Sequence, residues 1–406
     1  MLRRLAEFHV TVAVVSILVV TLLPFLPVPL DFEPEAYNVT LPKFEGPLAP
    51  NDFLDHAKIL FHHQLRGPES FAVKDGLIYT GTQFGHIYQI DPVKETITKV
   101  ANTGSDCEGL HDEERCGRVL GLRFAPSGEL YATDAYKGLV KIDVKTGKVN
   151  VLVKVGEYVG SSKLLFPDDL DIDDDGVIYY SQASTRWGLH QIVYIIMEHD
   201  NTGRILTYDT KTKRSDVLKE NLYFPNGLQL SKDRTALLFS ELLSKHVMKY
   251  ELEGPNKGKV SVFSENLPGD CDNIRLTNRG TYWVAIGVAR SADNPTILDS
   301  IAPFPLIAKT IMRFCWLLGQ ALESLNKFIK YDTIRDLSAD FTHGKILLKM
   351  AREGGVIVEL GDNGQILRSL HSSNYTLFSE VMEYDKNLYI GSFIKPYLLR
   401  VPVPSS

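Results

Sequence analysis

Short stretches of oxygen-bearing side chains recur along this chain at intervals that suit a shared metal site. They centre on Glu69, Asp168, Asn226 and the pair Asp272-Asn273, and none of them contains a thiol or an imidazole. Carboxylate and amide oxygens are the ligands that Ca²⁺ takes in proteins. If the stretches lie on a ring, we expect all five residues to converge on one Ca²⁺ ion. Taken singly, each motif also suits an ordinary turn.

The segments between these stretches resemble strands joined in hairpins. Each first run alternates and is rich in β-branched or aromatic residues, and turn residues such as Pro126-Ser127-Gly128 separate the runs. The six predicted hairpins are 77–80 with 87–91, 129–134 with 139–143, 177–180 with 204–209, 236–240 with 247–250, 281–284 with 355–360, and 387–392 with 398–401. From Tyr79 to Tyr131 to Tyr179 the period is roughly fifty residues, which is typical of a propeller blade.

This pattern predicts an all-β fold, a six-bladed β-propeller over residues 56–406, with an N-terminal transmembrane helix and a helical insertion in the fifth blade. Helices do not alternate with the strands, which argues against a parallel α/β sheet. A β-sandwich would not explain the period or the length. In a propeller, the start of each inner strand faces the central channel, so the oxygen-bearing stretches would share one layer.

Residues of about 291–345 interrupt the fifth hairpin and have the apolar spacing of an amphipathic helix. Three placements are open for this insertion. The helix packs on the propeller surface, forms a lid over the channel mouth, or lies on a bilayer.

The N-terminus predicts a membrane anchor. Arg3 and Arg4 precede an apolar run from Val10 to Leu26, and positive residues stay on the cytoplasmic side. We expect a short cytoplasmic tail at 1–8, a transmembrane signal anchor at 9–30 and a stalk at 31–55. The propeller would then lie on the lumenal or extracellular side of the plasma membrane or endoplasmic reticulum, as in a type II protein. A cleaved signal peptide is the alternative, although no small-residue cleavage site follows the run.

Two further features fit an oxidising compartment. Cys107 and Cys116 enclose a short polar loop, which predicts a disulfide, with free thiols as the alternative; Cys271 and Cys315 have no evident partner. Sequons at Asn38 and Asn374 predict glycosylation. The net charge of −6 offers no basic face for nucleic acid.

Several motifs resemble one family. The segments are 224–228 (Phe-Pro-Asn-Gly-Leu), 272–275 (Asp-Asn-Ile-Arg), the Cys107-to-Leu122 stretch and the region around Trp187. In combination they are similar to the strictosidine-synthase-like branch of the calcium-dependent six-bladed propellers, a superfamily that includes paraoxonases and gluconolactonase-like proteins. The likeness extends over nearly the whole chain.

This resemblance implies a Ca²⁺ ion in the channel and esterase activity on aryl esters. By position, the ligands would be Glu69, Asp168, Asn226 and Asp272, with Asn273 nearby. Two departures limit the inference. Strictosidine synthases carry a catalytic Glu where this chain has Ser379, so it is not expected to be a strictosidine synthase. Paraoxonases use a His where it has Arg118, so lactonase chemistry is not implied.

The predicted function is therefore a metal-assisted hydrolase of small lipophilic esters. Ca²⁺ would polarise the ester carbonyl, and Asp272 or Asp168 would activate water. Arg118 would hold negative charge on the substrate or else form a structural salt bridge. No Gly-x-Ser-x-Gly elbow marks a serine hydrolase. A non-catalytic receptor or scaffold with a structural Ca²⁺ is the alternative, and the sequence leaves the oligomeric state open.

Overall fold

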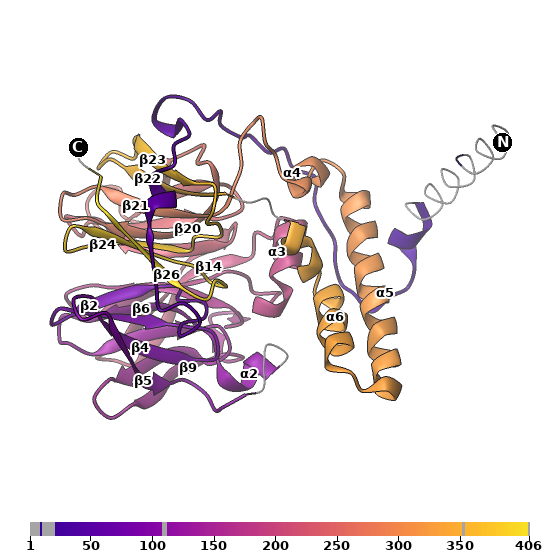
Figure 1. The fold of residues 1–406 in the computed structure, drawn as a ribbon, viewed down its shortest axis with the longest axis horizontal. Coiled ribbons are helices and arrows are strands. Elements are labelled where there is room, and N and C mark those ends of the chain that lie inside the picture. Colours follow the sequence, from indigo (N-terminus) through magenta and orange to yellow (C-terminus); the bar gives the residue numbers. More distant parts are fainter. Residues whose placement is uncertain (1–8, 10–20, 108–111, 351–353, 405–406) are drawn as a thin grey trace. The chain divides into compact units, whose positions relative to one another are not determined.

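A computed structural model of the chain describes residue 9 and residues 21–107, 112–350 and 354–404. The chain separates into two compact units (Figure 1). The larger unit comprises the described parts of Thr40–Leu189, Asn201–Asn294 and Arg352–Ser406, and it contains the sheets. The smaller unit comprises the described parts of Met1–Val39, His190–Asp200 and Pro295–Ala351, and it is helical.

Within the described residues, the larger unit forms six four-stranded antiparallel sheets, as the predicted propeller requires. In chain order the strands are β2 (Phe71–Lys74), β3 (Leu77–Gly81), β4 (His86–Asp91) and β5 (Thr96–Asn102); β6 (Val119–Phe124), β7 (Leu130–Asp134), β8 (Gly138–Asp143) and β9 (Lys148–Lys154); β12 (Pro167–Ile172), β13 (Val177–Gln182), β14 (Gly203–Asp209) and β15 (Arg214–Leu222); β16 (Pro225–Leu230), β17 (Ala236–Glu241), β18 (His246–Glu251) and β19 (Val260–Ser264); β20 (Gly269–Leu276), β21 (Tyr282–Ala289), β22 (Gly355–Leu360) and β23 (Ile366–Ser372); and β24 (Glu380–Tyr384), β25 (Asn387–Gly391) and β26 (Leu398–Pro402). A short hairpin of β10 (Tyr158–Val159) and β11 (Ser162–Lys163) lies before β12.

All six predicted hairpins are confirmed, and each supplies the two middle strands of a sheet, from β3–β4 through β25–β26. The first strand of each sheet contacts the first strand of the next, in the order β2, β6, β12, β16, β20, β24. These six inner strands therefore surround the centre of the propeller.

The ring closes through a strand that the sequence pattern did not reveal. β1 (Lys58–Leu60) is the fourth strand of the last sheet and pairs antiparallel with β26, with Lys58 opposite Arg400. In Figure 1 this indigo segment runs beside the yellow C-terminal strands. The Ser392 N–H also donates to the Pro68 carbonyl at 2.9 Å, which joins the last sheet to the first. Both ends of the propeller chain are thus held in one sheet, and the ring has no free edge there.

The hydrophobic core lies between neighbouring sheets. One cluster joins Leu238 and Val247 of the fourth sheet to Ile274 and Val284 of the fifth. Trp283, fully buried, packs between the fifth and sixth sheets and donates its indole N–H to Glu383 at 3.3 Å. Large aromatic residues are therefore used here as packing between blades rather than as walls of a pocket.

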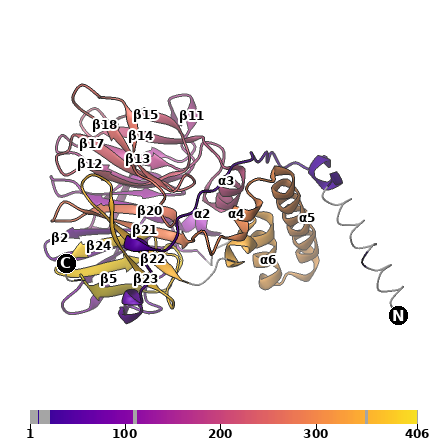
Figure 2. The same ribbon diagram turned by 90° about the horizontal axis from the view of Figure 1, so that it is seen from above.

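The helical unit contains the predicted insertion, which is seen from above in Figure 2. Its helices are α3 (Ile192–Glu198), α4 (Ile297–Ile301), α5 (Pro305–Ile329) and α6 (Asp332–Thr342), with the 3₁₀ turns η1 (Leu23–Phe25), η5 (Leu189–Gln191) and η6 (Lys345–Met350). α5 packs along α6, which confirms helix in residues 291–345. α3 comes from a second insertion, between β13 and β14, for which only a long connection was predicted.

Residues 10–20 of the predicted anchor lie outside the described residues. Among the helices that the structure describes, none combines the length and the apolar character that a membrane span needs. The segment predicted as a stalk is divided between the units at Val39. Its second half forms the turns η2 (Gly46–Leu48) and η3 (Phe53–His56), which pack on β23. The side chain of Asn51 donates to the Ser369 carbonyl at 3.0 Å, so this part of the segment is fixed to the propeller.

The predicted disulfide between Cys107 and Cys116 is present, and Cys116 ends the short helix α2 (Glu113–Cys116). Cys271 and Cys315 are buried free thiols. The two sequon residues, Asn38 and Asn374, are both exposed, and their glycosylation stays a prediction.

We predict that replacing both Cys107 and Cys116 by serine lowers the free energy of unfolding by about 2–3 kcal/mol, because the unfolded chain is no longer constrained by the loop. Urea unfolding of the two proteins measures the difference. Alkylation gives the control: the native chain unfolded without reductant should label only Cys271 and Cys315. Labelling of all four cysteines under that condition would contradict the disulfide.

Candidate metal centre

The five predicted ligand residues all lie on or just before inner strands. Glu69 stands two residues before β2, Asp168 and Asn226 are the second residues of β12 and β16, and Asp272 and Asn273 lie in the middle of β20. All five are buried, with 5% of their surface exposed or less. The fold thus places them on successive sheets at comparable positions.

A repeated backbone irregularity explains this placement. The pairing of β12 with β13 shifts register between Pro167 and Leu170, and that of β16 with β17 shifts between Pro225 and Leu228. β20 shifts against β21 between Cys271 and Ile274. Each predicted ligand of these strands lies within such a bulge, and a bulge redirects side chains locally while the strand continues.

Contacts between sheets hold the stretches close to one another. The Asn273 side-chain N–H donates to the Glu69 carbonyl at 3.3 Å, although 204 positions separate the two residues. Ser181 donates to the Asn226 carbonyl at 2.7 Å and accepts from the Asp169 backbone N–H at 2.9 Å. Gly227 permits the closest approach, because a Cβ at this position would lie 2.5 Å from Asn273 Cα. Oxygen donors that are far apart in sequence are thus neighbours at the hub.

Several of these oxygens are buried without a hydrogen-bond partner. They are Glu69 Oε2, Asn226 Oδ1, Asp272 Oδ1 and Asn273 Oδ1. Leaving a buried polar atom unsatisfied costs about 1–3 kcal/mol. Four such atoms from four of the five predicted ligands, all of them hard oxygens, are what an oxygen-coordinated cation such as Ca²⁺ would satisfy.

The carboxyl groups also disfavour one another's ionisation. Burial raises the pKa of Glu69 to about 8; nearby Arg118 opposes the shift, and Asp169 and Glu380 add to it. Burial and the charge of Glu69 raise the pKa of Asp168 well above its ordinary value. Asp272 is shifted in the same direction by burial, Glu69 and Asp168. A cation among them would remove this repulsion.

The described residues hold no group of three or more His, Cys, Asp or Glu side chains assembled as a metal cluster. Two of the five predicted donors are amides, so only three carboxylates belong to the predicted ligand set. Without a cation between them, these three carboxylates repel one another. The ligand set Glu69, Asp168, Asn226, Asp272 and Asn273 stays a prediction, and the donor chemistry fits Ca²⁺.

A second charged layer lies directly beside the first, and its role was not predicted. Arg275 of β20 donates from Nη1 to Asp169 Oδ2 at 2.7 Å and from Nε to Glu380 Oε2 at 2.8 Å. It also donates to Ser70 Oγ at 3.2 Å. Burial alone would raise the pKa of Asp169, but Arg275 and Arg123 hold it below its ordinary value.

Sequence contained one signal for this layer. Each acceptor of this layer comes directly after a residue named in the sequence analysis: Ser70 after Glu69, Asp169 after Asp168, and Glu380 after Ser379. Because side chains alternate along a strand, neighbouring residues face different directions. An arginine two positions after Asn273, inside an apolar strand, indicates a buried partner. Which carboxylates it pairs with depends on how the sheets are arranged around the centre.

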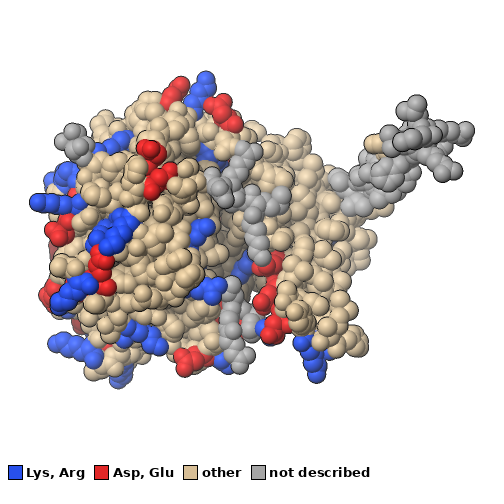
Figure 3. Space-filling model, viewed as in Figure 1, with Lys and Arg blue, Asp and Glu red and all other residues tan. Residues whose placement is uncertain are grey.

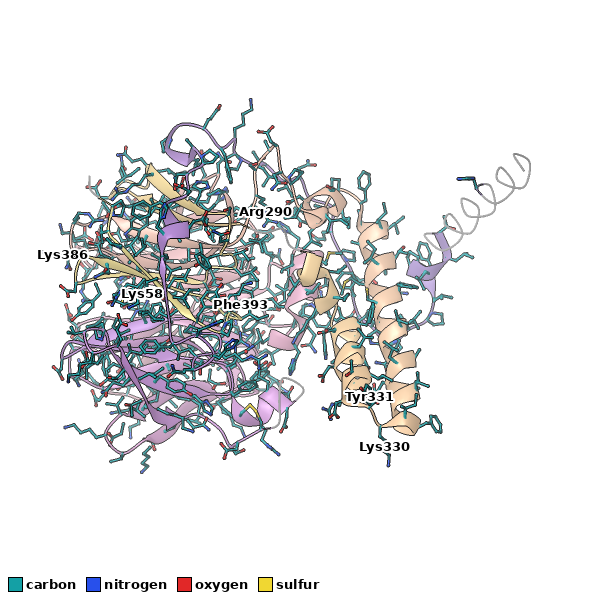
Figure 4. All side chains as sticks on the ribbon, viewed as in Figure 1. Lys58, Arg290, Lys330, Tyr331, Lys386 and Phe393 are labelled. Carbon is teal, nitrogen blue, oxygen red and sulfur yellow. A yellow bond between two sulfur atoms is a disulfide. The ribbon has the colours of Figure 1, made fainter. Side chains whose placement is uncertain are left out.

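Arg118 borders the first layer and forms a buried salt bridge. Its Nη1 donates to Glu113 Oε1 at 2.7 Å, and its Nη2 donates to the carbonyl of Phe393, which is labelled in Figure 4. Nη2 also lies 4.0 Å from Glu69 Oε2. The structural role that the sequence left open for Arg118 is therefore present, and its Nε has no hydrogen-bond partner.

Three aromatic residues of the propeller differ in their burial. Trp283 and Phe224 are buried, and Phe224 packs edge-on against Phe166. Trp187 is half-buried. A hollow of about 650 Å³ lies at the far ends of β20 and β24, where Arg279, Glu383 and Lys386 contribute to its lining. Because none of the predicted ligands lines this hollow, we assign it no part in the metal centre.

Comparison with known proteins agrees with the fold. Residues 168–255 match the family model for strictosidine synthase, and residues 46–90 match that for the strictosidine synthase-like N-terminal region. The adipocyte plasma membrane-associated protein of Salmo salar is 37% identical over 89% of this chain and 81% of its own length.

Solved structures show the same architecture. A gluconolactonase of Xanthomonas campestris superposes with a TM-score of 0.55 at 13% identity, over 93% of this chain and 99% of its own. A regucalcin of Agrobacterium tumefaciens, described as a calcium-binding protein, gives 0.52 at 10% identity, over 84% and 92%. At these identities the likeness establishes the propeller fold alone.

We predict that Arg275→Met lowers the free energy of unfolding by about 3–5 kcal/mol, because it leaves the buried Asp169 and Glu380 without their cation. Urea unfolding measures this change. The matched control is Lys58→Met, which breaks an exposed pair with Glu95 and should cost no more than about 1 kcal/mol. Equal losses in the two variants would contradict a special role for the buried pair.

The raised pKa of Glu69 predicts a pH dependence in the absence of a metal. In the unfolded chain this carboxyl ionises near its ordinary value of 4.5, and in the folded chain near 8. Its contribution to stability is therefore present below pH 4.5 and is lost as the pH rises toward 8. With chelator, the melting temperature should fall between pH 5 and pH 8, and added Ca²⁺ should abolish the fall. A fall of the same size with Ca²⁺ present would argue against a cation at Glu69.

Proposed function

The chain belongs to the adipocyte plasma membrane-associated protein family, and from this membership we propose that it is a membrane-tethered, calcium-dependent hydrolase of aryl esters. The observation that carries the proposal is the set of buried oxygens without partners at the hub: Glu69 Oε2, Asn226 Oδ1, Asp272 Oδ1 and Asn273 Oδ1. No other feature of the described fold explains why these atoms are left unsatisfied.

Glu69, Asp168, Asn226 and Asp272 would hold the Ca²⁺ ion, with Asn273 close to it. When bound, the ion supplies Lewis-acid polarisation of an ester carbonyl. Asp272 is the preferred general base, with Asp168 as the second candidate. It accepts the proton of the water that adds to the carbonyl, and the aryl oxygen leaves as the ester C–O bond breaks. Asp272 Oδ1, which has no hydrogen-bond partner, would bind the ion, and the other carboxylate oxygen of Asp272 would act as the base.

Arg118 holds negative charge at the edge of the site. Its guanidinium is buried and lies 4.0 Å from Glu69, and Glu113 fixes its position at 2.7 Å. A planar, permanently charged group anchored in this way keeps its direction while a substrate binds. The substrate class we propose is a small lipophilic ester.

Tethering follows from the N-terminal sequence and the family. Arg3 and Arg4 followed by the apolar run Val10–Leu26 favour a signal anchor with its N-terminus in the cytoplasm. The disulfide between Cys107 and Cys116 suits the oxidising side of a membrane. Relatives named as plasma membrane-associated proteins support a membrane location. The propeller would be lumenal or extracellular.

A non-catalytic receptor or scaffold is the second candidate, and one contact favours it. The position that carries a catalytic Glu in strictosidine synthases is Ser379 here, and the adjacent Glu380 is engaged by Arg275 at 2.6 Å. Glu380 is therefore not available as a base. In this case Ca²⁺ would only stabilise the ring, and the propeller surface would bind a partner.

The decisive test is hydrolysis of an aryl acetate by the purified full chain. We expect turnover with Ca²⁺ and its loss on chelation. Asp272→Asn should lower kcat/KM by at least about 100-fold, because general-base catalysis contributes about 10²–10⁴-fold. Asp174→Asn, at an exposed acid, should leave turnover unchanged.

Two outcomes would count against the hydrolase. Turnover that survives both chelation and Asp272→Asn would exclude the proposed site. If chelation lowers the melting temperature and no ester is hydrolysed at any calcium concentration, the scaffold is the better description.

A further inference from the structure

The long helix α5 has two apolar faces, and only one of them is covered. The covered face contains Ala308, Met312, Cys315 and Gly319, which are all buried. Gly319 meets α6 closely, since a Cβ there would lie 2.2 Å from Thr342 Oγ1, and Ser338 donates to its carbonyl at 2.9 Å. This face accounts for the packing of α5 within the helical unit.

The second face is an apolar stripe that is exposed or partly exposed to solvent along its length. We define the apolar stripe as Ile307, Ile311, Phe314, Leu318, Leu325 and Phe328 of α5. Their spacing alternates between four and three residues, with Ala321 at the one intervening position, which places them all on one side of a helix. Phe314 is 54% exposed, Leu325 46% and Phe328 87%. Apolar patches of this extent on a protein surface mark a binding site.

Charged residues of α5 avoid the apolar stripe. Lys309 pairs with Glu33, and Arg313 donates from Nη1 to the Leu26 carbonyl at 2.5 Å. Glu323 and Lys327 fall on the opposite side of the helix by their spacing. In the view of Figure 3 the helical unit is mostly tan, and charged atoms gather toward its lower end. Lys330 and Tyr331, labelled at that end in Figure 4, form the turn into α6.

The described end of the N-terminal apolar run lies against this same helix. The turn η1 contacts α5, and the bond from Arg313 to the Leu26 carbonyl fixes it there. Leu22 is 60% exposed and Phe25 71%. These residues belong to the Val10–Leu26 run, so the chain that we propose to enter the membrane leaves the folded protein beside α5.

We propose that the apolar stripe of α5 lies in the surface of a lipid bilayer. The stripe would sink to the boundary between headgroups and acyl chains, over a helix roughly 37 Å long at 1.5 Å per residue for its 25 residues. Aromatic side chains such as Phe328 and Tyr331 favour this boundary. The choice of a bilayer rests in part on the anchor proposed above.

A second copy of the chain is the competing occupant, since alternation of three and four residues also suits a helix pair. The positions that flank the apolar stripe argue against it. These positions carry no charge: they are Thr310, Leu317 and Ser324 on one side, and Leu322 and Ile329 on the other. Helix pairs use charges at such positions to set partner and orientation, whereas a broad apolar face suits lipid.

Tryptophan quenching in vesicles tests the proposal on the full chain. The chain is reconstituted into phosphatidylcholine vesicles with and without brominated phosphatidylcholine, which quenches tryptophan on contact. In the Phe328→Trp variant, we expect the brominated lipid to quench the emission of the added tryptophan. Glu323→Trp, on the opposite side of the same helix, is the matched control and should show only the quenching of the native three tryptophans. Both positions are exposed, so neither substitution disturbs the core.

Vesicle flotation, measured first, separates failure of the anchor from failure of the helix. A chain that does not float would overturn the anchor and with it the choice of a bilayer. If the chain floats but Phe328→Trp is quenched no more than Glu323→Trp, the anchor stands and the membrane contact of α5 is wrong. Covalent dimers of Phe314→Cys in those vesicles would then identify the apolar stripe as an interface between copies.

Discussion

Buried negative charge at the centre of the propeller is the constraint on which the rest of the structure depends. Asp168, Asp169, Asp272, Glu69 and Glu380 all reach the hub, and water is largely excluded from it. Like charges in such a place require compensation. Arg275, supported by Arg123, compensates Asp169 and Glu380. For the layer that contains Glu69, Asp168 and Asp272, the nearby cation among the described residues is Arg118, which lies 4.0 Å from Glu69 and is already engaged by Glu113. The two layers therefore differ in kind: one pairs its carboxylates with arginines, whereas in the other burial raises the pKa values of the carboxyl groups and several oxygens stay unsatisfied.

The backbone makes this arrangement possible. Inner strands β12, β16 and β20 carry a bulge where the oxygen-bearing residues stand, so that adjacent residues such as Asp168 and Asp169 serve different layers. Small residues let the strands approach closely: a Cβ at Gly121 would lie 2.6 Å from Asp169 Oδ1. Closure of the ring by β1 and β26 then fixes the first sheet against the last, and this brings Glu69 to Asn273.

The hydrolase proposal and the scaffold alternative both depend on this hub. The two functions differ in whether a substrate reaches the layer that contains Glu69, Asp168 and Asp272. By the sequence resemblance, Ser379 and Arg118 stand where strictosidine synthases and paraoxonases would carry a catalytic Glu and His. The helical unit adds a separate property. Its helix α5 is apolar on two sides, and a membrane that receives the second side would keep the protein at the surface where lipophilic esters are concentrated. The catalytic and membrane proposals can thus be judged independently, since one concerns the hub and the other a helix outside the sheets.

Local patterns in the sequence were enough to locate the repeating units. Alternation and turn residues located all six hairpins, the spacing of Cys107 and Cys116 indicated the disulfide, and apolar periodicity indicated helix within 291–345, because these signals are local. The sequence also singled out the five oxygen-bearing residues, whose types alone suggest a hard cation. The contacts that those residues make depend on how the sheets are arranged in the folded chain. β1 is three residues long and was not predicted, since its partner lies at the other end of the chain. The pairing of Arg275 with Asp169 and Glu380, and the burial of Trp283 between sheets, likewise depend on neighbours more than 90 positions away. Such contacts are set by how the sheets close into a ring, and no local pattern records them.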